Sequence, residues 1–408
     1  MLNDQVLDKV IERVTNRVEQ ANAYVLKEIG KKIKEIGTLT PANALQLQNI
    51  LKYGGDYDKI VQKLAEITRL NVQDIQKIFE SVAKSDYKFA NKFYKYRNKK
   101  FIPYEYNYAL QNEVQAIANA TANTYLNISR TLAFAQKTPS GIIYTDLAKT
   151  YQETIDKAIT NISQGKTVFQ DEMYRTIKEL SSSGLKTIDY TSNRHYRLDS
   201  AVRMNLKDGL LNLHNGMQEI IAKDIDADGV EISVHEYPAI DHEKVQGRQF
   251  SNEEFEKLQN GEEATDYKKK KYTLDHDGKN GYRPISTMNC YHYIFSIVLG
   301  VSEPEYSDKD LKEIMQRNKD GFELNGEHYT MYEGTQLQRN LELEIRKAKD
   351  TQIMAKASDN KELILESQNK ITLLTDNYRK LCKVSGLKPK MERMRVSQYK
   401  RIAKSKLK

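Results

Sequence analysis

A single apolar stripe at helical spacing runs through the first 36 residues and constrains the fold of this chain more than any other feature. Its members recur at steps of three and four: Leu2, Val6, Val10, Val14, Val18, Ala21, Val25, Ile29, Ile33 and Ile36. That period places them on one face of an α-helix and the charged residues on the other. The sequence therefore predicts one long amphipathic helix that ends at Gly37.

Further helices are expected along most of the chain, because only seven prolines and 19 glycines interrupt its 408 residues. Over 56–100 the pattern predicts two or three shorter helices, with Asn71 as a cap. Longer periodic stretches predict further helices over 105–136, 151–180, 198–223 and 362–384. Alternating apolar residues predict strands at 229–234 and 291–298. The expected fold class is mainly α, with long amphipathic helices and a small α+β module in the second half.

The length of the chain favours more than one domain. We expect a helical N-terminal domain (1–180), a small α+β module (181–302), C-terminal helices (303–387) and a basic tail (388–408). No segment approaches the ~20 apolar residues of a membrane span, and the charged N-terminus does not resemble a signal peptide. The two cysteines, Cys290 and Cys382, lie far apart and indicate no disulfide framework. These features are typical of an intracellular protein, or of a component of a particle assembled in a cytoplasm.

The positive charge of the chain is concentrated at its C-terminus. Residues 388–408 contain nine Lys or Arg and one acidic residue, so their net charge of +8 equals that of the whole chain. Such a segment can bind a phosphate backbone without sequence preference, or a negatively charged partner protein; a solvated C-terminus is the alternative. The candidate contact residues are Lys388, Lys390, Arg393, Arg395, Lys400, Arg401 and Lys404.

Four residues of metal-binding type lie at the two predicted strands: His235 and His242 follow the first, and Cys290 and His292 lie at the start of the second. Imidazole and thiolate are the ligands that zinc prefers. Within a strand, side chains two apart share a face, so Cys290 and His292 would point the same way and strand pairing could add the other two. The alternative is that the histidines bond to loop backbone and Cys290 is a small buried apolar residue.

A catalytic zinc site would also need an open coordination position and a general base. Glu236 and Glu243 lie beside the two histidines in the sequence and could supply the base. A zinc-dependent hydrolase is therefore one alternative function for the chain. A nucleic-acid-binding protein that acts through the basic tail is another.

Several motifs follow one another in the second half of the chain: GLKTIDYTSNRHYRLDSAVRMNL at 184–206, VEISVHEYPAIDHEKVQGRQFS at 230–251, NCYH at 289–292, TQLQRNLELEIRKAKD at 335–350 and YRKLCKVSGLKPKMERMRV at 378–396. In content and order they resemble the phage minor capsid protein 2 family. Members of that family carry a His, a second His seven residues on and a Gln-Gly pair, which here are His235, His242 and Gln246-Gly247. The chain departs from the family pattern at Ala239-Ile240, Val245 and Tyr291, where the family has Arg-Pro, Trp and Arg.

The resemblance implies a virion component of a tailed bacteriophage, made in the host cytoplasm and distantly similar to the Mu-type head-morphogenesis proteins. Its expected partners are the portal protein and other head proteins, with packaged DNA as a further partner of the basic tail. Its expected place is the capsid interior or the portal vertex. The family implies no established catalytic activity and no cofactor, so we expect a structural protein rather than an enzyme. Structural zinc at the four His and Cys residues remains the one cofactor hypothesis.

Overall fold

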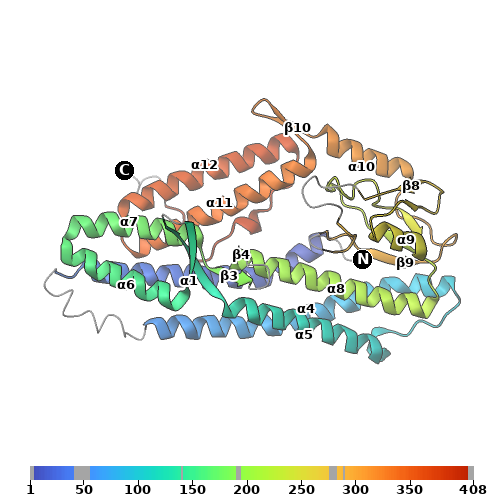
Figure 1. Ribbon diagram of the computed structural model, residues 1–408, viewed down its shortest axis with the longest axis horizontal. Coiled ribbons are helices and arrows are strands. Elements are labelled where there is room, and N and C mark those ends of the chain that lie inside the picture. Colours follow the sequence, from blue (N-terminus) through green and yellow to red (C-terminus); the bar gives the residue numbers. More distant parts are fainter. Residues whose placement is uncertain are drawn as a thin grey trace.

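The computed structural model of this chain describes residues 4–40, 56–138, 141–189, 194–274, 283–287 and 290–402. Within these ranges the fold is mainly α, with ten α-helices and short antiparallel strands, as the sequence predicts. Its long helices run roughly along the long axis of an elongated molecule (Figure 1). No helix in the described part of the chain is both long enough and apolar enough to cross a membrane.

The first helix, α1, spans Asp4–Gly37 and confirms the helix predicted from the apolar stripe. Leu2, the first member of that stripe, lies outside the described residues. The later members are buried, with at most 3% of their surface exposed: Val14, Val18, Ala21, Val25, Ile29, Ile33 and Ile36. The stripe faces neighbouring helices, which is the usual way an amphipathic helix is stabilised.

The second described helix, α4, is continuous over 41 residues, Asp56–Tyr96, so the prediction of shorter helices here was wrong. Asn71, the predicted cap, lies inside α4 and is fully buried. Its amide nitrogen donates to Tyr125 Oη at 2.8 Å, and its amide oxygen accepts from Arg17 Nη1 at 3.4 Å. Because neighbouring helices satisfy this side chain, it does not compete for its own backbone, and the helix continues.

A four-stranded antiparallel sheet follows, where the sequence pattern predicted no strands. The 3-10 turn η1 (Tyr104–Tyr106) leads into α5 (Tyr108–Arg130), which ends before the predicted position 136. The strand order is β2-β1-β3-β4, with β1 Leu132–Thr138, β2 Gly141–Asp146, β3 Lys186–Asp189 and β4 Arg194–Arg197. The Leu, Ala, Gln and Lys residues of β1 are good helix formers. Its pairing with β3 joins distant segments, so the local pattern does not reveal it.

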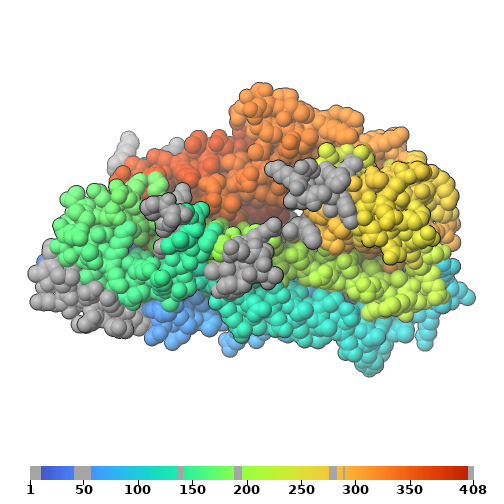
Figure 2. All heavy atoms as spheres, in the orientation of Figure 1, coloured from blue at the N-terminus to red at the C-terminus, as the bar shows by residue number. Residues whose placement is uncertain are grey.

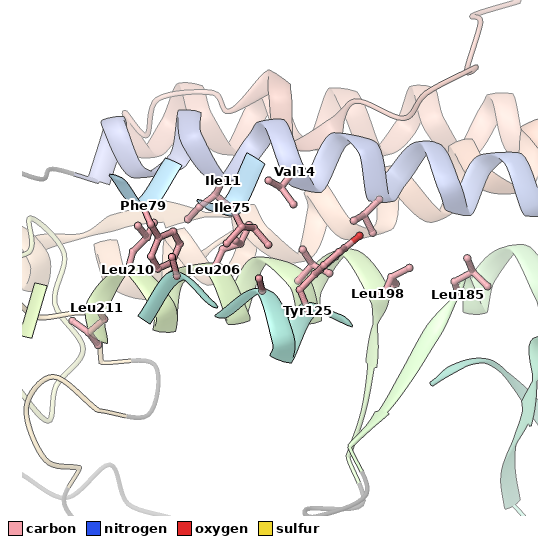
Figure 3. Close-up of a cluster of buried hydrophobic side chains, with 14 of the residues drawn as sticks. Ile11, Val14, Ile75, Phe79, Tyr125, Leu185, Leu198, Leu206, Leu210 and Leu211 are labelled. Atoms are coloured by element: carbon pink, nitrogen blue, oxygen red, sulfur yellow. The ribbon is translucent and has the colours of Figure 1, made fainter. Parts of the chain in front are cut away.

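Three further groups of helices complete the body: the hairpin of α6 (Leu147–Gln164) and α7 (Lys166–Ser183), the long α8 (Leu198–Ile225), and the hairpin of α11 (Met331–Ala357) and α12 (Lys361–Ser385). One hydrophobic cluster extends through these helices together with α1, α4 and α5. Figure 3 shows part of it, where Val14 of α1, Phe79 of α4 and Leu206 of α8 point toward a shared interior. The domain boundaries proposed from the sequence stay predictions.

A small α+β module lies on α8 near one end of the molecule, as Figure 2 shows. Its central sheet has the order β6-β5-β9. Its elements are β5 Gly229–Ile232, β6 Gln249–Ser251, α9 Asn252–Gln259, β7 Ala264–Thr265, β8 Lys271–Tyr272 and β9 Ile294–Ile297. Both predicted strands therefore exist, in shorter form, and pair with each other. Between the module and α11 lie α10 Asp308–Asp320 and the hairpin of β10 Phe322–Leu324 and β11 Glu327–Tyr329; the turn η2 Met391–Met394 follows α12.

Candidate metal centre and basic segment

The pairing of β5 with β9 brings two distant loops together. The strands are antiparallel, and Ile232 at the end of β5 lies opposite Ile294 at the start of β9. Beyond this pair, the Ser233 N–H donates to the Tyr293 carbonyl and the Tyr293 N–H donates to Ser233 Oγ, both at 2.8 Å. Residues just after β5 therefore lie beside residues just before β9.

Three of the four predicted metal ligands meet at this place. Cys290 Sγ lies 3.2 Å from His242 Nδ1 and 3.2 Å from His292 Nδ1. The three ligand atoms all lie within 4.8 Å of one another, and all three side chains are buried. The fourth residue, His235, is half-buried, and its ring centroid lies 4.2 Å from that of His292.

The convergence of Cys290 and His292 has a different origin from the one predicted. The pair precedes β9 instead of lying within a strand. Tyr291 between them has a φ of 60°, in the left-handed region, so the backbone is not extended there. The left-handed backbone at Tyr291, not strand alternation, directs both side chains to one point.

Burial keeps this cluster neutral. Burial lowers the pKa of His242, and it lowers the pKa of His292 further, with the neighbouring imidazoles adding to the effect. Burial also raises the pKa of the Cys290 thiol. At neutral pH and without a metal ion, the cluster therefore holds two uncharged imidazoles and one thiol.

Three residues around the cluster had no predicted role in a metal site. The His242 Nε2–H donates to the Arg283 carbonyl at 2.6 Å, and the Arg283 guanidinium pairs with Asp241 at 2.8 Å. The Gln246 Oε1 accepts the His235 backbone N–H at 2.9 Å and lies 3.4 Å from His292 Nε2. Gln246 belongs to the Gln-Gly motif, so that motif was a usable signal for its position beside the histidines.

The two glutamates considered as general bases point elsewhere. Glu236 is exposed and accepts a hydrogen bond from Tyr237 Oη at 3.1 Å. Glu243 is buried and directed toward α10, where Lys319 Nζ lies 3.1 Å and Asn318 Nδ2 3.4 Å from its carboxylate. These contacts lend no support to a hydrolytic site.

The predicted basic tail lies along α11 over residues 388–402, which we call the basic segment. Three side chains of α11 donate to its backbone carbonyls: Arg346 to Arg393 at 2.7 Å, Lys349 to Met394 at 2.5 Å and Lys356 to Lys400 at 2.5 Å. Val396 and Tyr399 pack with Ala23 of α1 and Ile353 of α11. The segment is therefore attached to the helical body.

The candidate contact residues of the basic segment differ in exposure. Lys388, Arg395, Lys400 and Arg401 are exposed, and Lys390 is half-buried. Arg393 is buried, with its Nη1 4.0 Å from the Glu342 carboxylate. Lys404 lies outside the described residues.

Comparison with known protein families gives a match over nearly the whole chain: the family model of phage minor capsid protein 2 matches residues 2–383. The chain belongs to the phage minor capsid protein 2 family. The match includes the N-terminal helices, although the motifs recognised in the sequence lie in the second half. The basic segment follows the matched region. Neither the curated proteins nor the solved structures gave a match to this minor capsid protein.

Proposed function

We propose that this minor capsid protein acts in head morphogenesis by docking on the portal protein or the adjacent inner capsid, and that it remains in the virion. The observation that carries the proposal is the family match over residues 2–383. A body of long helices around one continuous core is suited to this task, because it holds a binding surface rigidly at a distance from the rest of the molecule.

The connection between α4 and α5 is the surface that we assign to docking. Four large side chains are exposed at this connection. Their exposed fractions are 47% for Tyr96, 43% for Ile102, 72% for Tyr106 and 73% for Tyr108. The connection lies at the end of the molecule away from the α6–α7 hairpin (Figure 1). Tyrosine is enriched at protein interfaces because its ring buries a large area while its hydroxyl still bonds to a partner.

Co-purification with the portal protein of the same phage tests the proposal. We expect the unaltered chain to co-purify and to be incorporated into virions, and the double variant Tyr106→Ser, Tyr108→Ser to bind about 30-fold more weakly, as expected for loss of interface anchors. Leu373→Ser is the matched control, because Leu373 is 62% exposed on α12. If the unaltered chain neither binds portal protein nor enters virions, the proposed function is wrong.

We propose DNA contact by the basic segment as a second function, supported by the way that segment is held. Its backbone is attached to α11, while Lys388, Arg395, Lys400 and Arg401 remain exposed. Cations held on a rigid support neutralise phosphates at a smaller cost in chain entropy than a disordered tail would pay.

Substitution of its cations tests this second function better than deletion of the basic segment does. Deletion would remove Val396 and expose Ala23 of α1 and Ile353 of α11, against which it packs. In the test variant, Gln replaces all four exposed cations. We expect the logarithm of its DNA-binding constant to fall less steeply with the logarithm of the salt concentration, with a slope shallower by about 0.9 for each phosphate that is no longer neutralised. Gln at Lys77, Lys309, Lys312 and Arg317, which are exposed on α4 and α10, is the control. An equal slope in both variants would argue against DNA contact by this segment.

A further inference from the structure

We propose that His242, Cys290 and His292 bind one zinc ion, which cross-links two loops of the α+β module. The three ligand atoms already converge in a buried place, with Cys290 Sγ 3.2 Å from each of the two Nδ1 atoms. One sulfur and two imidazole nitrogens form a donor set that zinc prefers over calcium or magnesium.

The hydrogen bonds around the cluster fix the tautomer of both histidines. A carbonyl oxygen can only accept, so the bond between His242 Nε2 and the Arg283 carbonyl places the proton of His242 on Nε2. The amide of Gln246 is oriented by the His235 backbone N–H, which needs an oxygen as acceptor. His292 Nε2 faces that same oxygen at 3.4 Å and therefore donates to it.

Both Nδ1 atoms consequently present lone pairs to Cys290. A thiol has one hydrogen and can satisfy only one of them, so among the residues that the structure describes one buried lone pair has no donor. The Ser286 backbone N–H lies 3.4 Å from Sγ and donates to the sulfur, as backbone amides do for a thiolate. A zinc ion between the three atoms satisfies both lone pairs and the sulfur together.

The present spacing is close to that of a zinc site. With a Zn–S distance of about 2.3 Å and a Zn–N distance of about 2.0 Å, tetrahedral geometry sets each S···N separation at about 3.5 Å. The observed 3.2 Å separations need to lengthen only slightly. A closed tetrahedral site takes a fourth ligand. The His235 ring lies beside His292, with 4.2 Å between the ring centroids, but its nitrogens are not among the three converging ligand atoms, so His235 would have to turn toward the ion to complete the site.

The outer contacts are also those of a metal site. Zinc-binding histidines usually donate their second ring N–H to a carbonyl or an amide, which sets the ring orientation. Here the Arg283 carbonyl and Gln246 have that role, and Asp241 holds Arg283 through the ion pair at 2.8 Å.

Zinc binding would tie together residues 48 apart in the chain, His242 and Cys290. The thiol loses its proton to solvent when the Zn–S bond forms, while the two neutral imidazoles release none. Since such a preformed arrangement does not exist in the unfolded chain, the binding free energy adds to the stability of the module.

The test is metal analysis of the purified full chain, followed by titration of the metal-free protein with Zn²⁺ and Co²⁺. We expect one zinc per chain, and a Co²⁺ spectrum with tetrahedral and thiolate bands. Cys290→Ser and His292→Ala should weaken zinc binding by more than 100-fold, and Gln246→Ala by about 10- to 100-fold as an outer contact. Cys382→Ser and His328→Ala are matched controls on α12 and β11 and should bind normally.

Failure of the unaltered chain to hold zinc, or to take it up at a one-to-one ratio, would overturn the inference whatever the variants do. Full zinc affinity in Cys290→Ser would overturn it as well. Because the unaltered chain gives the stoichiometry and the Co²⁺ spectrum, a variant that fails to fold does not block the test. Neither the presence nor the absence of zinc affects the docking proposal, because binding to the portal protein is measured in a separate experiment.

Discussion

At the scale of single residues, a buried ion-pair network joins α1, α8 and α11 through Arg197, the last residue of β4. Arg197 contacts Asp199 and Asp350, each at 3.0 Å, and all three side chains are buried. Arg346 approaches Asp199 at 3.0 Å and Glu19 at 3.5 Å. The network joins three helices that are remote in the sequence, at a considerable desolvation cost that the pairing must offset.

Glu19 is the weak member of this network and gives it a pH dependence. Burial raises the pKa of the Glu19 carboxyl well above its ordinary value of 4.5, and the Asp199 carboxylate raises it further. The folded protein therefore binds this proton more tightly than the unfolded chain does. Its contribution to stability is complete below pH 4.5 and is lost as pH rises toward the pKa of the folded state.

We therefore expect Glu19→Gln to gain stability relative to the unaltered protein as pH rises. The amide keeps the shape and a hydrogen to donate, but it cannot ionise. The difference in the free energy of unfolding should grow by about 1.4 kcal/mol for each pH unit above 4.5 until the folded-state pKa is reached. Urea unfolding at several pH values measures it, with the exposed Glu323→Gln as control. Parallel stability curves for Glu19→Gln and the unaltered protein would contradict the assignment.

At the scale of elements, α8 packs closely on α4 and α5 at Gly209. A Cβ atom added there would lie 2.7 Å from Thr121 Cγ2 and 2.9 Å from Phe79 Cζ, both closer than real contacts allow. The lack of a side chain at this position is what lets the three helices approach.

Gly209→Ala should therefore destabilise the protein by about 1–3 kcal/mol, because the added methyl forces the helices apart. Gly216→Ala on the same helix is the control. Its Cβ would meet only the ends of two flexible side chains, Ile117 and Glu113, at 3.0 Å and 3.1 Å. Alanine is the better helix former, so this variant should be neutral or up to about 1 kcal/mol more stable. Equal melting temperatures for the two variants would rule out a close crossing at Gly209.

The elements also show what sequence could and could not predict. The stripe of α1 is local information, and it predicted the helix and its buried face. The continuity of α4 at Asn71 depends on Tyr125 and Arg17, which no local pattern reveals. At the candidate metal centre, residue types and a shared motif predicted three residues that the fold does bring together, His242, Cys290 and His292. The left-handed backbone at Tyr291 and the acceptor role of the Arg283 carbonyl depend on tertiary structure.

At the scale of the whole molecule, two hydrophobic cores differ greatly in size. The large one extends through most of the long helices. The small one, inside the α+β module, contains Ile232, Val245, Phe250, Leu258, Ala264, Leu274 and Ile285. His214 of α8 links the two parts, because its ring nitrogens lie 2.9 Å from the Asp86 carboxylate and 3.0 Å from the Ile294 carbonyl.

A small core with many loop residues opens at a lower free energy than a large one. We expect the backbone amides of β6 and α9 to exchange with solvent faster than those of α8, when hydrogen exchange of the full chain is followed by mass spectrometry. Removal of bound zinc by a chelator should speed exchange in the module and leave α1 and α8 unchanged, because a ligand stabilises only the unit that contains its site. Equal exchange in the module and the body, with and without chelator, would mean that the two cores unfold as one unit. The cross-link at His242, Cys290 and His292 would then contribute nothing of its own to the stability of the module.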